Sequence, residues 1–169
     1  MSKFGTQVNP ENLLIGQFVP KQQHKFLLSF SDSNYEIPAF LIKTLSRPTL
    51  TINKITHDHN SSKVHFAGKA EWEDISISLV DPIDISASAK VMEWVNMSHD
   101  SSTGVSGYPS DYKKDLTINI LGPYGDMVEE WTIIGAFITN VDFSDSDSSS
   151  DDFHTITLTL SIDNAIWEY

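Results

Sequence analysis

Three histidines lie close together in the sequence and could in principle bind a metal ion. His57 and His59 in the segment THDH have the spacing that puts side chains on one face of a strand, and His65 follows across a turn. The segment supplies no cysteine and no defined fourth ligand. Histidines at such a turn are more often surface residues, so we interpret the segment as exposed and expect neither a metal site nor any other cofactor.

The acidic tract DFSDSDSSSDD, residues 142–152, partly resembles a calcium-binding loop. Asp145 and Asp147 alternate as the first ligands of an EF-hand do. An EF-hand also needs glycine at its sixth position and glutamate at its twelfth, where this chain has Ser150 and Ile156. The pattern therefore predicts a solvated acidic loop between two strands rather than a calcium site.

Paired carboxylates are the remaining candidates for catalysis. Glu71 with Glu73, and Glu129 with Glu130, could serve as acid and base only in a pocket that separates their pKa values. Adjacent strand residues such as Glu129 and Glu130 point to opposite faces instead. The chain also contains no nucleophile elbow, P-loop or dinucleotide fingerprint, so the sequence predicts that the protein is not an enzyme.

Length and composition indicate one compact domain spanning residues 1–169. The chain has 169 residues, of which 40% are hydrophobic, enough to form a core. It has no cysteine, which excludes disulfides and thiolate chemistry. Its apolar runs are too short to cross a bilayer and its N-terminus has no signal-peptide core, so we expect a soluble protein made in the cytosol.

The net charge of −12 is concentrated in the last third of the chain. Residues 1–114 contain all eleven Lys and Arg and twelve acids, whereas residues 115–169 contain eleven acids and no Lys or Arg. Proteins that grip a double helix do so with basic patches, and an acidic surface repels it. Any encounter with nucleic acid should therefore be one without tight binding.

A period of two, typical of strands with two different faces, dominates the chain. It is clearest near the C-terminus, where Thr155, Thr157 and Thr159 alternate with apolar residues. Ile55 falls out of phase with the residues before it, which predicts a bulge or bend near Asn53 and Lys54. Further strands are expected near residues 26–30, 50–56, 75–80, 116–121 and 127–138, with turns at SDSN, HNSSK and GPYGD.

One segment, residues 84–98, follows the period of an amphipathic helix. Its apolar residues recur at i, i+4, i+7 and i+8, and Asp84 or Ser86 could cap its N-terminus. Residues 1–16 have no clear period and are expected to form an arm. The pattern alone thus predicts several antiparallel strands with one helix on the outside.

Six segments occur in a recognisable order along the chain. They are IPAFLIKTLSRPTLTINKI, KVHFAGKAEWEDISISLVD with an expected Ala-Gly turn, AKVMEWVNM, GYPSDYKKDLTINIL, EEWTIIGAFITNVDFSDSDSS and FHTITLTLSIDNA. On these segments, the chain from about residue 17 to the C-terminus resembles the tail tube proteins of contractile-tailed bacteriophages, the myoviruses. In GAFITNVDF it departs from that pattern, because Ile138 stands where relatives usually have a proline. Residues 1–16 match no part of the pattern.

The resemblance implies a mainly β fold of two packed antiparallel sheets, sandwich-like or barrel-like, with one flanking α-helix. Hemolysin-coregulated proteins share this fold. It also implies a structural virion protein, assembled in the host cytoplasm, whose hexameric rings stack into the inner tail tube that conducts double-stranded DNA during ejection. The implied partners are further copies of the chain, the tail sheath protein, the baseplate tube initiator, the tape measure protein in the lumen and transiently passing DNA. No insertion into a membrane by the protein itself is implied.

Two groups of residues follow as candidate sites. The exposed turn and the arm of residues 1–16 are expected to contact the next ring, with His57, Asp58, His59, Asn60 and Lys63 forming the turn. A lumen that is polar and negative would let DNA slide without sticking. The candidate acids for the lumen or the outer wall are Glu129, Glu130, Asp142, Asp145, Asp147, Asp151 and Asp152.

Three alternatives remain open at the level of sequence. A baseplate component that initiates the tube would share the fold without polymerising along the tail, although such proteins usually carry extra segments. A ring-forming protein of a contractile secretion or injection system, of the hemolysin-coregulated type, would share the architecture without the same order of segments. An enzyme or ligand-binding barrel would need a converging polar pocket, which the sequence does not indicate.

Overall fold

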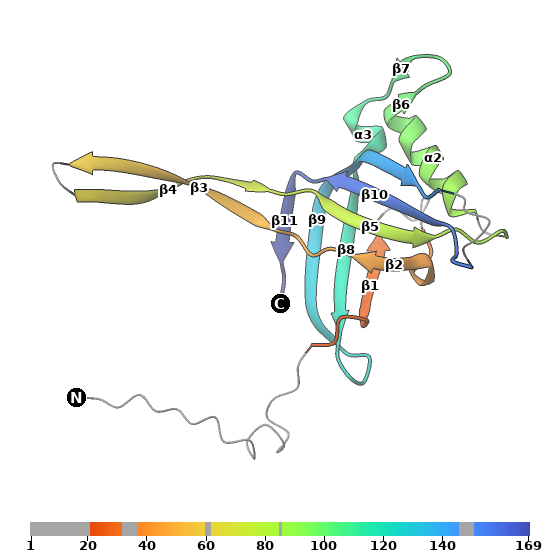
Figure 1. Ribbon diagram of the computed structural model, residues 1–169, viewed down its shortest axis with the longest axis horizontal. Helices are drawn as coiled ribbons and strands as arrows, with labels where there is room; N and C mark the ends of the chain where they lie inside the picture. Colours follow the sequence, from red (N-terminus) through yellow and green to blue (C-terminus); the bar gives the residue numbers. More distant parts are fainter. Residues whose placement is uncertain (1–20, 32–36, 60–61, 85, 146–150) are drawn as a thin grey trace.

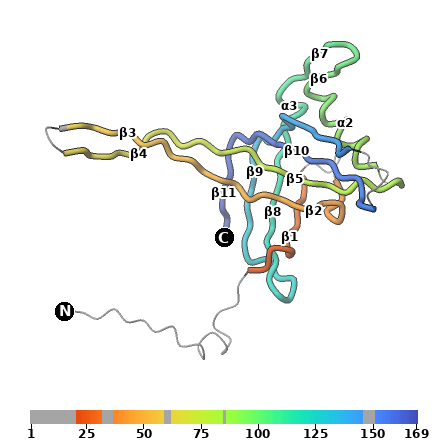
Figure 2. The backbone as a smooth tube through the Cα atoms, in the orientation of Figure 1, coloured from red at the N-terminus to blue at the C-terminus, as the bar shows by residue number. Residues whose placement is uncertain are grey.

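The computed structural model describes residues 21–31, 37–59, 62–84, 86–145 and 151–169, without the side chain of His59. The expected arm of residues 1–16 and most of the SDSN turn lie outside these ranges. No helix in the described ranges is long and apolar enough to span a membrane. Figures 1 and 2 show a body of strands with a helix at one end and a long hairpin projecting from it.

The first sheet is antiparallel and runs in the order β1 (Phe26–Phe30), β8 (Lys114–Leu121), β9 (Met127–Phe143), with β11 (Asn164–Trp167) on the other side of β9. The expected GPYGD turn joins β8 to β9, and Gly125 adopts φ 83° within it. Alternate residues of these strands point into the core, as the period of two requires. Leu28, Leu116, Ile118 and Ile133 are each at most 3% exposed.

The second sheet is formed by the C-terminal part of β9, followed by β10 (Thr155–Ser161), β5 (Ile75–Val80) and β2 (Ile42–Leu45). Strand β9 therefore belongs to both sheets. It bends near Gly135, which has φ 68° and whose added Cβ would overlap the Asp163 carboxylate. Only glycine tolerates both this conformation and this close approach, so Gly135 allows one strand to serve two sheets.

The core lies between the two sheets and under helix α2 (Ala87–Ser98). Expectation and structure agree on two packed antiparallel sheets with a flanking helix. Of the two expected N-caps, Ser86 is the one that the helix uses, and its side chain accepts a hydrogen bond from the Ala89 N–H at 3.2 Å. Trp94 is 1% exposed, stacks edge-on against Phe30 at 5.8 Å and donates from Nε1 to the Tyr112 carbonyl at 2.7 Å.

The projecting hairpin consists of β3 (Leu50–His59) and β4 (Ser62–Trp72). The predicted bulge near Asn53 is confirmed by a register shift between Ile52 and Lys54. The expected Ala-Gly turn is instead part of β4, where Gly68 faces this shift. A Cβ on Gly68 would approach the Asn53 carbonyl oxygen to 2.8 Å, so the glycine permits the close approach of the two backbones.

Short elements complete the described fold. The 3₁₀ helix η1 (Ala39–Leu41) precedes β2, and a small hairpin of β6 (His99–Asp100) and β7 (Val105–Ser106) follows α2. Helix α3 (Pro109–Tyr112) then leads into β8. The elements α3, β6 and β7 lie beside α2 at one end of the body in Figure 1, away from the long hairpin.

Candidate assembly surfaces

The outward side of the second sheet is a hydroxyl-rich surface, which we call the hydroxyl face. Its strands β5, β10 and residues 137–143 of β9 contain no Lys, Arg or His. Thr157 lies between Ser78 and Asp142 in the register, and Thr159 lies between Ser76 and Asn140. The hydroxyl face is defined by the small polar residues of β5 and β10 that alternate with buried neighbours and by the β9 residues opposite them, namely Ser76, Ser78, Asn140, Asp142, Thr155, Thr157, Thr159 and Ser161.

The outward side of the first sheet is less uniform. It carries Glu130 and Glu168 together with Leu27 and Ile166, which are each 40% exposed. The Glu168 carboxylate accepts a hydrogen bond from the Thr132 hydroxyl at 3.5 Å. This mixture of acids and large apolar side chains distinguishes the surface from the hydroxyl face.

Glu129 does not lie on either outward surface. It is 5% exposed and belongs to the inward face of the first sheet, whereas Glu130 lies on the outward face. Its carboxylate forms ion pairs with Lys21 and, at 3.5 Å, with Arg47, and it accepts a hydrogen bond from Trp131 Nε1 at 2.6 Å. The expected place of Glu129 on an exposed wall is therefore corrected, because its carboxylate is held inside the protomer.

The charge state of Glu129 is set by competing effects. Burial acts to raise the pKa of this carboxyl, because it disfavours the charged form. Hydrogen bonds from Lys21 and Trp131, with the positive charges of Lys21 and Arg47, act in the opposite direction and prevail, so the pKa lies below its ordinary value. Glu129 is thus an ionised group that links the start of the described chain to β9.

The other candidate acids are distributed over several places. Asp142 lies within β9, on the hydroxyl face, rather than in the loop that was expected to begin there. Asp145, Asp151 and Asp152 are exposed in the connection from β9 to β10, and Asp147 lies outside the described residues. We call the segment from Ser144 to His154 the acidic connection.

The expected stacking turn is the tip of the projecting hairpin. Asp58 is opposite Lys63, and His57 is opposite Val64. His65 pairs with Thr56 instead, so His57 and His65 lie on opposite faces of the hairpin and do not converge. Asn60 is outside the described residues, which contain no cluster of three or more potential metal ligands of the His, Cys, Asp or Glu type.

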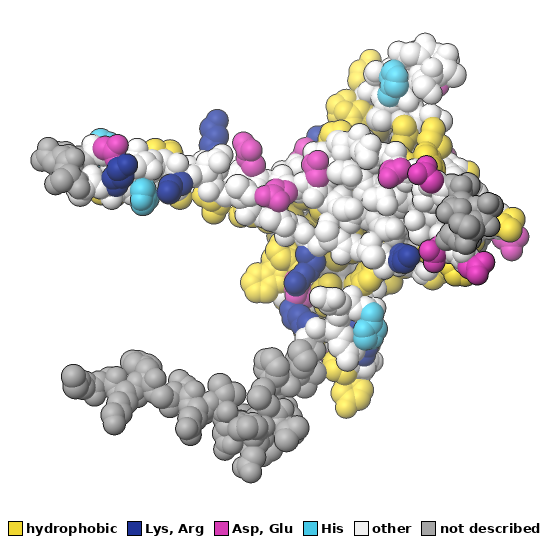
Figure 3. Space-filling model, viewed as in Figure 1, with side chains coloured by type: hydrophobic (Ala, Val, Ile, Leu, Met, Phe, Trp, Pro, Cys, Tyr) yellow, Lys and Arg dark blue, Asp and Glu magenta, His cyan; other side chains and the backbone are white. Residues whose placement is uncertain are grey.

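The hairpin exposes large apolar side chains along its length. Ile52 is 54% exposed, Ile55 57% and Phe66 56%, and Ile55 is directly opposite Phe66. Figure 3 shows the hairpin standing clear of the body, so nothing in the described chain covers these side chains. An apolar surface of this kind usually marks an interface with another molecule.

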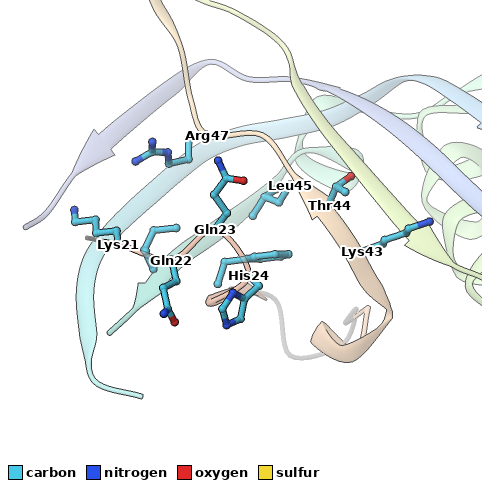
Figure 4. A pocket seen from close by; sticks show the side chains of 10 residues that line it. Lys21, Gln22, Gln23, His24, Lys43, Thr44, Leu45 and Arg47 are labelled. Atoms are coloured by element: carbon cyan, nitrogen blue, oxygen red, sulfur yellow. The ribbon is translucent and has the colours of Figure 1, made fainter. Parts of the chain in front are cut away.

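A basic pocket lies at the open edge of the sandwich, between the segment that precedes β1 and strand β2 (Figure 4). It has a volume of about 450 Å³, and its apolar lining residues are Phe26, Leu45 and Ile120. Sequence reasoning missed this pocket, because Lys21 is more than 20 positions from Lys43 and Arg47 in the chain. The only signal in the sequence is that all eleven Lys and Arg precede residue 115.

Comparison with known proteins assigns a family to this architecture. The family model described as T4-like virus tail tube protein gp19 matches residues 22–165. Comparison with the curated proteins gave no match.

Solved structures share the fold. The tube-terminating cap of the anti-feeding prophage has a TM-score of 0.74 at 18% identity, with coverage of 91% of this chain and 94% of that one. The sheath-tube complex of the extracellular contractile injection system PVC gives 0.70 at 18% identity, covering 95% and 97%. The SPP1 tail tube gives 0.58 at 10% identity, covering 88% and 78%.

Proposed function

Because the chain belongs to the T4-like virus tail tube protein gp19 family, a family of structural tube proteins and not of enzymes, we propose that its copies form the inner tube of a bacteriophage tail. In this proposal six copies form a ring, rings stack into a hollow tube, and double-stranded DNA passes through the lumen during ejection. The particle is a virion with a contractile tail, assembled in the cytoplasm of the host.

The hydroxyl face is the observation that carries the proposal, and we assign it to the lumen. A wall over which DNA slides must not hold phosphates, and β5, β10 and residues 137–143 of β9 contain no Lys, Arg or His, so the only basic residue in the strands of this sheet is Lys43 in the edge strand β2. Ser and Thr present small polar groups, and Asp142 adds negative charge on the same face. The outward side of the first sheet suits the lumen less well, because it exposes Leu27 and Ile166.

The ring is supported by the two edges of the second sheet. Strand β2 is the last strand at one edge, and residues 137–143 of β9 pair on only one side, with β10, within the described chain. Unpaired strand edges are a liability for a free protein, and closing a barrel removes them. In the proposed ring, β2 of one copy lies beside the C-terminal part of β9 of the next copy, and the two strands run antiparallel.

The outer wall of the tube is assigned to the side of the protomer that lies across the core from the hydroxyl face. Glu130 and Glu168 give this side an acidic character. The tail sheath must surround the tube and still slide along it, which favours weak and salt-sensitive contacts between an acidic tube and a basic sheath surface. Glu130 is thus an outer-wall residue in this proposal, and Asp142 is a lumen residue.

Stacking is assigned to the projecting hairpin. Its tip, with His57, Asp58 and Lys63, can reach a copy in an adjacent ring, and the exposed Ile55 and Phe66 provide apolar area for the contact. The arm of residues 1–16 is proposed to contribute to the same contact. The baseplate tube initiator would offer the first ring the surface that each later ring offers to the next, and the tape measure protein would occupy the lumen before the DNA.

The first experiment is negative-stain electron microscopy of the purified protein, with light scattering over a concentration series. We expect hollow six-fold rings and, as concentration rises, stacked tubes. A protein that stays monomeric even when it is seeded with baseplates would contradict the proposal and would favour the baseplate component. Rings that never stack would favour a ring-forming protein of the hemolysin-coregulated type.

A further inference from the structure

The second sheet has one charged residue in each of its two edge strands and none between them. Strand β2 contains Lys43, and residues 137–143 of β9 contain Asp142. The strands between these edges, β5 and β10, contain no Lys, Arg, His, Asp or Glu. An otherwise uncharged sheet thus has one base at one open edge and one acid at the other.

Neither charge is paired within the described part of the protomer. Lys43 and Asp142 are both exposed, and no described residue forms an ion pair with either of them. The other two cations of the basic pocket, Lys21 and Arg47, are paired with Glu129. Figure 4 shows Lys21 and Arg47 on one side of that pocket and Lys43 on the other. Both edge charges are therefore available to another copy of the chain.

The two residues lie at nearly the same level of the sheet, but at opposite edges. Asp142 is opposite Thr157, and the same cross-strand row reaches Thr44 of β2, which directly follows Lys43. Within one protomer β5 and β10 separate the two edges, and three strand spacings of about 4.8 Å amount to roughly 14 Å. Side chains that stand perpendicular to a sheet do not bridge that distance, so the pair requires a second copy.

The signs of the two charges select among the ways in which open edges can meet. A two-fold contact between equal edges would bring two lysines or two aspartates toward each other, and like charges on opposite strands are destabilising. A contact between β2 and the C-terminal part of β9 of another copy brings opposite charges together, which stabilises a strand pair. Such a contact is head-to-tail, and head-to-tail contacts generate rings or filaments instead of two-fold dimers.

We propose that Lys43 forms an ion pair with Asp142 of the adjacent copy at every boundary in the ring. The pair gives the ring its direction, and it fixes the register in which β2 meets β9, because a slip of two residues would separate the charges by about 7 Å. It also neutralises the only base in the strands of the proposed lumen wall, so no free ammonium remains there to hold phosphate. This inference rests on the proposed ring and adds to it the contact that orders the copies.

The first test uses the absence of cysteine from the natural chain. The variant K43C/D142C is assembled into tubes and oxidised. A disulfide requires Cα atoms within about 7 Å, and the two positions of one copy are roughly 14 Å apart, so the disulfide must join different copies. We expect a ladder of covalent oligomers up to the hexamer on a non-reducing gel. The control is K43C/D145C, because Asp145 is an exposed acid three positions farther along the chain, about 10 Å away.

The outcomes separate this inference from the proposed function. Normal tubes of K43C/D142C that give no more cross-linked product than K43C/D145C would overturn the inference and leave the tube function intact. Abundant dimers from Lys43→Cys alone would also overturn it, because they would place two β2 edges together. The absence of rings and tubes from the natural protein would instead count against the function itself.

Exchange of the two charges gives a second readout, which does not depend on the cysteine variant. Lys43→Asp and Asp142→Lys should each raise the concentration at which rings form about three-fold or more, because each places like charges at every boundary. The double variant K43D/D142K restores opposite charges and should recover most of this loss. Asp145→Lys is the matched control and should leave ring formation unchanged.

Light scattering in low salt measures ring formation, and urea unfolding checks that every variant is folded. Equal assembly of K43D and the natural protein would overturn the inference. A double variant that is folded but no better at forming rings than the single variants would overturn it as well.

Discussion

Glu129 and Glu130 are adjacent in the chain but occupy different environments. The strand period places Glu129 on the inward face, where it pairs with Lys21 and Arg47, and Glu130 on the outward face. The same period places Thr157 and Asp142 together on the hydroxyl face. At the scale of single residues, the structure therefore distinguishes charges that stabilise the fold of the protomer from exposed charges that are proposed to lie on the walls of the tube.

Replacing Glu129 should destabilise the protomer. We expect Glu129→Ala to lower the free energy of unfolding by about 1–3 kcal/mol, because it removes the acceptor of the Trp131 indole N–H and the partner of two cations. The side chains of Lys21 and Arg47 are 46% and 61% exposed, so water can solvate them and the loss stays moderate. Urea unfolding measures this, with Glu130→Ala as the control, and equal effects of the two variants would contradict the burial argument.

The same group makes a defined contribution to pH dependence. The pKa of Glu129 in the fold lies below its ordinary value of 4.5, so its ionised form stabilises the folded state. This stabilisation is complete above that ordinary value and is lost as the pH falls through the lower pKa of the folded state. Glu129→Gln should therefore differ most from the natural protein above about pH 5, and the difference should shrink in acid. Unfolding experiments at several pH values measure this difference. A difference in the free energy of unfolding that grows on acidification would contradict a lowered pKa for Glu129.

Thr157 tests the assignment of the lumen. Thr157→Lys would place a ring of positive charges on the hydroxyl face, and these charges should hold phosphates that the natural wall releases. Tubes assembled with short double-stranded DNA should then retain fragments protected from nuclease, and the retention should weaken as salt rises. Thr132→Lys adds the same charge on the outward side of the first sheet and should protect none. Equal protection by both variants would reject the lumen assignment.

At the scale of elements, two features let a small protomer offer several surfaces. Strand β9 passes from one sheet to the other at Gly135, so the hydroxyl face and the outward side of the first sheet share one strand. The hairpin of β3 and β4 makes its main contacts within itself and projects from the body (Figure 1). A two-stranded hairpin alone is marginally stable in water, so we expect this element to be held by a neighbouring copy in the proposed tube.

The hairpin should matter for assembly and little for folding. Phe66→Ser removes a side chain that is 56% exposed in the protomer, so we expect the free energy of unfolding to change by less than about 0.5 kcal/mol. If the tube buries this side chain, the lost contact is worth about 1.5–3 kcal/mol, and the concentration needed for stacking should rise roughly 10-fold or more. Light scattering and electron microscopy measure this. Ile83→Ser is the control, because Ile83 is 99% exposed and lies outside the hairpin.

At the scale of the whole molecule, a single protomer leaves several surfaces uncovered that another copy could cover. Within the described chain, the second sheet ends in an open strand edge on each side, and the hairpin exposes apolar side chains. A tube of identical copies would satisfy these needs together, because each deficiency of one copy can be met by a surface of another.

The arm of residues 1–16 gives a prediction at this scale. The buried apolar residues of the described chain begin at Leu28, so a protein lacking residues 1–16 should unfold at the same urea concentration as the full chain. We expect it to form rings and to stack poorly. Sedimentation and electron microscopy of both proteins make the comparison. Tubes of unchanged length would show that the arm does not contribute to stacking.

Much of the fold could be predicted because strands and helices place side chains at fixed periods, which a local sequence pattern displays. Alternation identified the two faces of β5, β8 and β10, the helical spacing of Ala87, Val91 and Trp94 identified α2, and the phase change before Ile55 located the bulge. These features depend on residues close in the chain. They follow from the two side-chain periods of strands and helices, which sequence alone displays.

The sites depended on tertiary structure, because they join residues that are distant in the chain. Lys21 and Glu129 are 108 positions apart, and the basic pocket draws on β2, β8 and the segment before β1. A period of two shows that a strand has two faces without showing what either face meets, so alternation could not reveal that Glu129 is enclosed. The sequence by itself determined the strongly alternating strands β1, β3, β5, β8, β9 and β10, the helix, the acidic last third and the family resemblance, whereas β2 and β11 were not predicted and β4 was expected to contain a turn. Only the packing of the two sheets decided which charges are internal and which edges stay open for another copy.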